Sequence, residues 1–304
     1  MKKPVISIRQ LSFVAALAEE LNFSRAAKRC QVSQPTLSTG LRECEMALGV
    51  QIAERTRRSV ILTPAGREIA ARARVILAAV RDLEDLATQT AAGMPNTPLR
   101  LGAIPTVGPY LLPHAMPEIR TASPDLKFYL REELAESLRD GLASGRLDAI
   151  LLARPFDLEE FHVEPLFEDG FQIAMAADAP HPVAPAGLEG ARLLLLDEDH
   201  CLHRHTLDAC PEMRLQPDRR ALATGLPTLA SMVAEGLGAT LLPQLAIDGG
   251  AFADHRLSLV PLEKARPREV VLAWRKTAAR GVEFGHLAEI LRQTRQRLAE
   301  RAAS

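Results

Sequence analysis

The stretch Asn22-Phe-Ser-Arg-Ala-Ala-Lys-Arg-Cys-Gln-Val-Ser-Gln-Pro-Thr-Leu-Ser-Thr-Gly-Leu41 predicts two short helices joined by a tight polar turn. We expect Ser24 to act as the N-cap of the first helix, because a serine oxygen can accept a hydrogen bond from an unpaired N–H of the first turn. The turn falls at Gln31-Val32. Ser33 is the expected cap of the second helix, and Pro35 fits its first turn, where a missing N–H costs nothing. The pattern is typical of a helix-turn-helix.

Apolar residues spaced three and four apart predict the buried faces of the helices in this region. A preceding support helix carries Leu11, Val14, Ala15, Ala18 and Leu21, and the helix after the turn carries Leu37, Leu41, Cys44 and Leu48 before Gly49 ends it. Such stripes build cores in every class of protein. Periodicity alone therefore leaves open a three-helix packing unit that binds nothing.

Charge favours nucleic-acid binding over such a packing unit. Residues 1–74 carry 13 Lys or Arg against 6 Asp or Glu, a net charge of +7 in a chain whose total is −1. A second basic cluster follows between two short apolar runs, as expected for a wing that lies on the phosphate backbone. The residues that we expect to contact DNA are Ser24, Arg25, Ser33, Gln34, Pro35, Thr36, Ser38, Arg42, Arg55, Arg57 and Arg58.

The block from Ile8 to Gly66 closely resembles the winged helix-turn-helix of LysR-type transcriptional regulators. The likeness rests on Phe-Ser-Arg-Ala-Ala, Val-Ser-Gln-Pro-Thr-Leu-Ser, Leu-Gly-Val, Glu-Arg-Thr and Leu-Thr-Pro-Ala-Gly. It implies a cytoplasmic, non-enzymatic bacterial regulator without a cofactor, which binds double-stranded promoter DNA as a homodimer or homotetramer and contacts RNA polymerase. It also implies an α/β fold in three parts: a DNA-binding domain at 1–63, a dimerisation linker helix at 64–93, and a regulatory domain at 97–304 with two subdomains, built like a periplasmic binding protein.

The linker helix is also predicted by the residues themselves. Thr63 is a suitable cap and Pro64 a suitable first residue, and an apolar seam follows with spacings of 4, 3, 4, 3 and 4: Ile69, Ala73, Ile76, Val80, Leu83 and Ala87. A seam this short needs a partner, so it favours a dimer whose two reading heads address a two-fold-related site. A helix packed within its own chain is the alternative. Residues 93–98 then break the helix.

Beyond residue 98, apolar runs alternate with helical stretches, which predicts βαβ units and a mainly parallel sheet. We expect strands at 99–104, 127–130, 148–153, 171–176, 193–196, 257–262 and 270–275, with helices after Pro109, around 134–142 and near 283–301. The 304 residues are 47% hydrophobic and contain no apolar run long enough to span a membrane. No secretory signal follows Met1-Lys2-Lys3, so we expect a cytoplasmic protein without a membrane partner.

Two of the four cysteines stand out by their neighbours. Cys30 and Cys44 fall on predicted helices of the DNA-binding block and are interpreted as small core hydrophobes. Cys201 lies directly after a predicted strand, among His200, His203, Arg204 and His205. Such surroundings favour the thiolate, which attacks peroxide to give a sulfenic acid, and a second thiol converts that acid to a disulfide. Cys210 is the obvious second thiol.

The spacing of this pair makes it a candidate switch. If the intervening segment is helical, nine residues of rise separate the two α-carbons by about 13 Å, beyond the approximately 7 Å limit for a disulfide. Forming the bond would then force local refolding. That could change a dimer interface and the spacing of two DNA-reading heads.

The residues from Leu195 to Leu202, with Cys210, and from Gly102 to His114 resemble the hydrogen-peroxide-sensing members of the LysR-type family. The resemblance implies that Cys201 is the peroxidatic residue and Cys210 the resolving one. It further implies that Thr106 and His200, with His203 beside them, line a pocket that holds peroxide. The chain departs from the pattern after the peroxidatic cysteine, where His203 and Arg204 replace an arginine followed by an aspartate.

Three other interpretations of this site remain open. His200, Cys201, His203, His205 and Cys210 offer enough ligands for zinc but lack a paired short spacing. A thiol peroxidase would use the same cysteine chemistry but has no need of a DNA-binding head. The third is a LysR-type regulator that binds a small-molecule effector in a cleft, with Thr106 and Thr228 at helix starts that face it.

Overall fold

A computed structural model describes residues 5–55, 60–92, 98–179, 192–210, 217–262 and 265–303. The chain divides into two compact units, which we describe separately. The first comprises Met1–Pro95 with Asp140–Arg146, and the second comprises Asn96–Arg139 with Leu147–Ser304.

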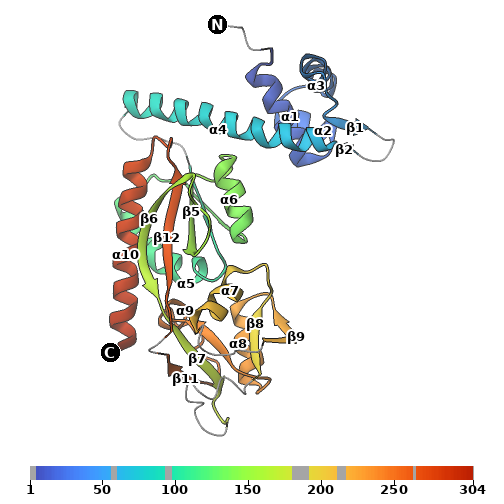
Figure 1. Ribbon diagram of the computed structural model, residues 1–304. Helices are drawn as coiled ribbons and strands as arrows, with labels where there is room; N and C mark the ends of the chain where they lie inside the picture. Colours follow the sequence, from blue (N-terminus) through green and yellow to red (C-terminus); the bar gives the residue numbers. More distant parts are fainter. Residues whose placement is uncertain are drawn as a thin grey trace. The chain divides into compact units, whose positions relative to one another are not determined.

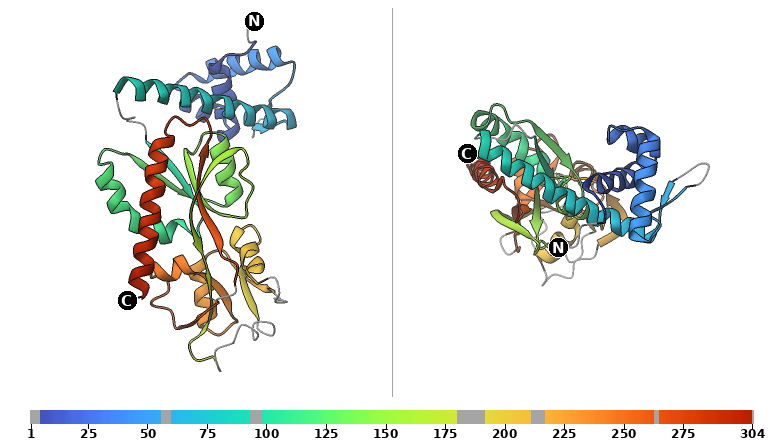
Figure 2. Two further views of the ribbon diagram at one scale, coloured as in Figure 1. Left: turned by 60° about the vertical axis from the view of Figure 1, so that its left-hand side comes forward. Right: turned by 90° about the horizontal axis from the view of Figure 1, so that it is seen from above.

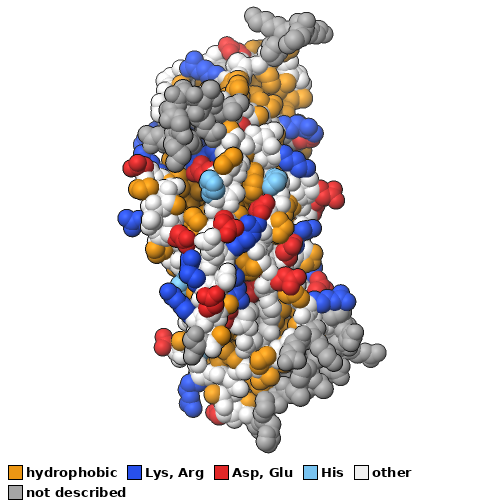
Figure 3. All heavy atoms as spheres, turned by 90° about the vertical axis from the view of Figure 1, so that its left-hand side faces the viewer, with side chains coloured by type: hydrophobic (Ala, Val, Ile, Leu, Met, Phe, Trp, Pro, Cys, Tyr) orange, Lys and Arg blue, Asp and Glu red, His pale blue; other side chains and the backbone are white. Residues whose placement is uncertain are grey.

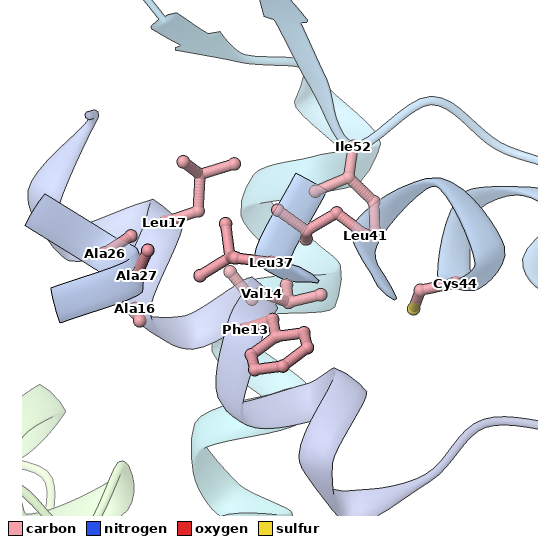
Figure 4. Packing of buried hydrophobic residues seen from close by; sticks show 11 residues of the cluster. Phe13, Val14, Ala16, Leu17, Ala26, Ala27, Leu37, Leu41, Cys44 and Ile52 are labelled. Carbon is pink, nitrogen blue, oxygen red and sulfur yellow. The ribbon is translucent and has the colours of Figure 1, made fainter. Parts of the chain in front are cut away.

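The first unit is a winged three-helix domain with a long helix after it (Figure 1). Its elements are α1 (Ile8–Glu20), α2 (Phe23–Arg29), α3 (Gln34–Leu48), the antiparallel pair β1 (Ala53–Arg55) and β2 (Val60–Leu62), and α4 (Pro64–Ala92). Phe13, Val14 and Leu17 of α1 meet Leu37 and Leu41 of α3 in one core, which Figure 4 shows from close by. Gly40 allows the close approach of α1 and α3, because a Cβ there would lie 2.7 Å from the Phe13 ring.

The caps of these helices agree with the sequence analysis except at one position. The Ser33 hydroxyl accepts from the Thr36 N–H and begins α3, and Gly49 ends it with φ at +70°. Ser24 was predicted wrongly as the cap of α2, because the Asn22 side chain accepts from the N–H groups of both Ser24 and Arg25. The predicted stripes also extend too far, since Leu21 and Leu48 at the helix ends are exposed.

Helix α4 begins at the predicted cap, where the Thr63 hydroxyl accepts from the Gly66 N–H at 2.9 Å. Only the start of its apolar seam is covered within this unit. Ile69 packs against the core of the winged domain, and Ala73 is 1% exposed. Further along, Ile76 and Leu83 are 45% and 65% exposed. The outer part of the seam therefore presents apolar side chains to solvent in the single chain.

The second unit contains a five-stranded sheet with the order β4-β3-β5-β12-β6. The strands are β3 (Leu99–Ala103), β4 (Phe128–Glu132), β5 (Ala149–Arg154), β6 (Phe161–Asp169) and β12 (Arg268–Arg275). β3 runs parallel to β4 and β5, whereas β12 is antiparallel to β5 and β6. The prediction of a mainly parallel sheet was wrong, because the C-terminal part of the chain returns as an antiparallel strand, β12, between β5 and β6.

Two smaller sheets complete this unit. β7 (Phe171–Ala176) is the centre of an antiparallel sheet with β10 (Thr240–Pro243) and β11 (Leu257–Pro261). β8 (Leu193–Leu196) pairs in parallel with β9 (Pro217–Ala223), and the Leu194 N–H donates to the Ala239 carbonyl beside β10. β6 and β9 were not predicted from the sequence.

Helices cover these sheets. They are α5 (Gly108–Ala122), α6 (Ala135–Ala143), α7 (Cys201–Ala209), α8 (Leu226–Ala234), α9 (Gln244–Asp248) and α10 (Gly281–Ala303). α10 lies along the five-stranded sheet in both side views (Figures 1 and 2). Figure 3 shows side chains of both charges intermixed on one face of the molecule, in keeping with surface ion pairs such as Arg292–Glu289. No helix among the described residues is long and apolar enough to cross a membrane.

The strand connections place three polar residues at one point of the second unit. β6 ends at Asp169 and the chain continues after Gly170 as β7, so this strand leads from one sheet to the next. Arg268, the first residue of β12, is the register partner of Asp169. Thr106 lies in the short connection between β3 and α5. The fold thus gathers residues from distant parts of the sequence beside α7.

Candidate DNA interface and candidate redox site

The candidate DNA interface is the outer face of α3, which the turn after α2 positions. Gln31 adopts a positive φ of 55°, and the Val32 N–H donates to the Ala27 carbonyl at 3.0 Å. Of the α3 residues predicted to contact DNA, Pro35, Thr36 and Arg42 are exposed, and Gln34 and Ser38 are half-buried. The predicted residues therefore form one polar face, opposite the buried Leu37.

Several of these side chains already have partners within the domain. The hydroxyls of Ser33 and Thr36 lie 2.7 Å apart in a hydrogen bond. The Ser24 hydroxyl donates to the Gln34 side-chain oxygen at 3.0 Å. Arg25 forms an ion pair with Glu20 at 3.1 Å, so a contact from Arg25 to phosphate would compete with this carboxylate.

The predicted wing is only partly described. Arg55 is the last residue of β1, and its side chain is not among those described. Arg57 and Arg58 lie outside the described residues. Their contacts with phosphate stay predictions from the sequence.

The candidate redox site is built around α7, which begins at Cys201 and ends at Ala209. Cys210 is the residue directly after the helix, and both thiols are free. A helical rise of 1.5 Å per residue places the two α-carbons about 13 Å apart, so the thiols cannot join while α7 is intact.

The two histidines predicted to line this site have different positions. His200 directly precedes α7, in extended backbone, and its side chain caps nothing. His203 is held to the end of β8, because its Nδ1 bonds the Leu196 carbonyl at 2.7 Å. Both side chains are half-buried, as is Cys201.

A buried arginine, Arg268, is the main feature that the sequence analysis missed. Arg268 is 2% exposed. Its guanidinium donates to the Asp169 carboxylate at 2.9 and 3.0 Å, to the Thr106 hydroxyl at 2.9 Å and to the Thr106 carbonyl at 2.9 Å. Asp169 also accepts from the Leu245 N–H at 2.8 Å. Thr106 is thus fixed by Arg268, and it does not cap α5, which begins after Val107 without a side-chain cap.

The electrostatics of Cys201 differ from the expectation. Burial raises the pKa of the Cys201 thiol, while the charges of Arg268 and Arg204 and the N–H groups at the start of α7 lower it without reversing the shift. The prediction that the surroundings favour the thiolate overall was wrong, because burial outweighs the cations. The cations and N–H groups nevertheless act on this sulfur and not on Cys210, whose pKa burial alone raises.

His205 does not add to the positive charge around Cys201. Burial, with the charge of Arg268 beside it, lowers the pKa of His205 to about 4, so the ring is neutral at pH 7. The side chain is 3% exposed. It lines a cavity of about 270 Å³ together with Pro155, Asp208, Ala209, Arg266, Pro267 and Arg268.

The structure also bears on the other two cysteines, on the zinc site and on Thr228. Cys44 is fully buried and Cys30 half-buried, and burial raises the pKa of both thiols. Among the described residues, no three His, Cys, Asp or Glu side chains are grouped so that they could hold a metal ion. Thr228 is exposed on α8, which begins after Gly225 and not after a threonine.

Comparison with known proteins gives a consistent match over most of the chain. Residues 8–67 match the family "Bacterial regulatory helix-turn-helix protein, lysR family", and residues 92–296 match the "LysR substrate binding domain". The "Hydrogen peroxide-inducible genes activator" of Escherichia coli O6:H1 is 40% identical over 292 residues, 94% of this chain and 95% of the relative. The "HTH-type transcriptional regulator EstR" of Acinetobacter baylyi is 37% identical over 291 residues, 94% of this chain and 96% of that protein.

A solved structure is similar over nearly the full length. It is a full-length variant of OxyR from Pseudomonas aeruginosa, with a TM-score of 0.79 and 37% identity, covering 95% of this chain and 96% of that one. This likeness covers the helix-turn-helix, the linker helix and the C-terminal α/β domain, which has the architecture of a periplasmic binding protein.

Proposed function

This chain belongs to the LysR family of transcriptional regulators, and we propose that it senses hydrogen peroxide through a reversible disulfide between Cys201 and Cys210. The family makes it a DNA-binding regulator and not an enzyme. The observation that carries the proposal is that α7 separates two free thiols, with the buried Arg268 acting on the first of them. The peroxide-inducible relative at 40% identity supports the choice of oxidant.

The first chemical step takes place at the Cys201 sulfur. Its thiolate attacks one oxygen of hydrogen peroxide and the O–O bond breaks. The sulfur becomes a sulfenic acid, and the second oxygen leaves as hydroxide and takes up a proton to form water. Arg268 stabilises the negative charge on sulfur and on the leaving oxygen. We place Thr106, His200 and His203 in the pocket that holds the peroxide.

The second step closes the disulfide. The Cys210 thiolate attacks the Cys201 sulfur, the S–O bond breaks, and a second hydroxide leaves and is protonated to water. Peroxide has then gained two electrons, and the two thiols have lost them. Because the sulfurs must meet within a few ångströms, α7 unfolds in this step.

DNA binding responds to the structural change in the segment from Cys201 to Cys210. We propose that the protein acts in the cytoplasm as a homodimer or homotetramer joined through α4. The change around α7 then alters the spacing of its DNA-reading heads. RNA polymerase is the proposed partner at the promoter. The helix-turn-helix binds double-stranded DNA in either state.

The direct test is peptide mass mapping of the reduced protein after a brief exposure to near-stoichiometric hydrogen peroxide. The expected product is a Cys201–Cys210 crosslink, with Cys30 and Cys44 still free. Cys201→Ser is the matched variant: it should bind DNA like the reduced protein and show no change in binding after peroxide. Oxidation of Cys201 no faster than that of Cys30 contradicts the proposal.

A second candidate function is regulation by a small-molecule effector in the regulatory domain. Two observations favour it: residues 92–296 match a family described as a substrate-binding domain, and EstR, a regulator of a different name, is 37% identical. Against it, the Thr106 hydroxyl accepts from Arg268 and Thr228 is exposed, so neither threonine is arranged as an anion-binding cap. A peroxide-insensitive Cys201 would favour the effector.

A further inference from the structure

The hydrogen bond between Ser24 and Gln34 joins the two helices of the DNA-reading motif. Ser24 is the second residue of α2 and Gln34 the first residue of α3. The Ser24 hydroxyl donates to the Gln34 side-chain oxygen at 3.0 Å. Both backbones are well anchored, because Asn22 caps α2 and Ser33 caps α3. In this arrangement the Gln34 carboxamide oxygen is turned toward Ser24.

The orientation matters because a carboxamide has two different ends. The oxygen accepts hydrogen bonds and the NH₂ group donates two. Two-point recognition of adenine needs both ends at once, the oxygen for the N6 amino group and the NH₂ for N7. With its oxygen bonded to Ser24 on α2, Gln34 has an NH₂ group that takes no part in this contact.

Donors in the major groove distinguish two classes of base. Guanine and thymine carry a keto oxygen, O6 or O4, whereas adenine and cytosine carry an amino group at the same place. An NH₂ group donates a hydrogen bond to a keto oxygen, whereas an amino group, which is also a donor, repels it. Guanine suits it best, because O6 and N7 are neighbouring acceptors for its two hydrogens.

The side chains that neighbour Gln34 at the start of α3 do not compete with it as hydrogen-bond donors to a base. The Ser33 and Thr36 hydroxyls bond to each other, and Ser33 also accepts from the Thr36 N–H at 3.3 Å. Pro35 has no polar side chain. Gln34 thus supplies the directed donor of the first helical turn.

We propose that Ser24 positions Gln34 as a donor that selects a keto base, guanine before thymine, in the major groove. Ser24 is the positioning residue and Gln34 the residue that touches the base. The proposal rests on DNA binding by the helix-turn-helix and is independent of the chemistry at Cys201.

The test is selection from a randomised double-stranded DNA library with the full, reduced chain, followed by sequencing of the bound duplexes. The position read by Gln34 is the one whose base preference disappears in Gln34→Ala. In the native protein that position should carry guanine or thymine, preferred over adenine and cytosine by about tenfold, the size of one well-made hydrogen bond.

The positioning role of Ser24 is tested with two further variants. Ser24→Ala should reduce the keto preference at that position several-fold and raise the share of adenine, because the freed carboxamide can turn. Ser24→Thr keeps the hydroxyl and should restore the native profile. Ser12→Ala, which removes a hydroxyl bonded only within α1, is the matched control and should change nothing.

Three results would overturn the proposal. The first is an amino-base preference in the native protein, which would mean that the carboxamide oxygen faces the DNA. The second is a Ser24→Ala profile identical to the native one. The third is a Gln34→Ala profile that loses preference at no position. In each case DNA binding itself, and the proposed peroxide response, would stand.

Discussion

Arg268 connects three parts of the regulatory unit through one side chain. Its guanidinium bonds Asp169 from β6 and both the hydroxyl and the carbonyl of Thr106 after β3. A buried ion pair of this kind contributes little to net stability compared with an apolar pair, but removing one partner leaves an uncompensated charge. Arg268 therefore has both a structural role and an electrostatic one at Cys201.

Arg268→Gln should lower the free energy of unfolding by about 3 kcal/mol and slow the oxidation of Cys201 by peroxide. The thiol loses a charge that lowers its pKa, and each unit by which the pKa rises reduces the thiolate population about tenfold. Both quantities are measurable, by denaturant unfolding and by the rate of thiol loss at fixed pH. The exposed neighbour Arg266→Gln is the control. Native oxidation kinetics in folded Arg268→Gln would remove Arg268 from the mechanism.

Local residue patterns indicated the candidate cysteines and gave no sign of the buried arginine. Cys201 and Cys210 could be proposed as a pair from the sequence because they are nine positions apart, at the two ends of one short segment. Arg268 and Asp169 are 99 positions apart, and Arg268 and Thr106 are 162 apart. No short-range pattern indicates such a contact, since it depends on how the strands β6 and β12 are paired.

At the scale of single elements, α7 combines a thiol at each end with a buried neutral histidine on its inner face. The groups around His205 are Arg268, Arg266, Asp208, Arg204 and the Pro155 carbonyl. A protonated His205 would meet three arginines and one carboxylate. Protonation should therefore loosen α7.

The native protein should lose stability more steeply than His205→Gln as the pH falls from about 6.5 to about 4. In this window the unfolded chain binds a proton at His205 and the folded chain does not, so the free energy of unfolding falls by about 1.4 kcal/mol per pH unit. Thermal unfolding at several pH values measures the difference. Parallel curves for the two proteins would contradict the assignment.

Element prediction from the sequence worked where the pattern is local. Strands 171–176 and 193–196 were predicted at their observed bounds, since each is a short apolar run. β6 was missed because Pro165 and its acidic residues break the alternation. The antiparallel position of β12 was missed because strand direction is set by tertiary pairing and not by residue pattern.

At the scale of the whole molecule, the exposed seam of α4 is the feature that supports the proposed assembly. Ile76 and Leu83 are exposed in the single chain although they belong to the heptad seam. A partner helix would bury them, and it would hold two reading heads at a fixed spacing.

Leu83→Glu should shift the assembly toward monomers and weaken binding to a two-fold-related DNA site, because it places a charge in the apolar seam. Sedimentation and DNA titration measure the two effects. Arg72→Glu, at an exposed position of the same helix, should leave assembly unchanged. If Leu83→Glu assembles like the native protein, α4 is packed within its own chain or the partner lies elsewhere.

The intact α7 has a consequence for how long a signal lasts. A disulfide that forms only when a helix unfolds is less stable by the free energy of that helix. Such disulfides are more easily reduced than relaxed ones. If cellular thiols reduce the proposed Cys201–Cys210 bond, α7 would form again without any further input. The molecule would thus keep no memory of a past exposure, and its output would follow the balance of oxidant and reductant at each moment.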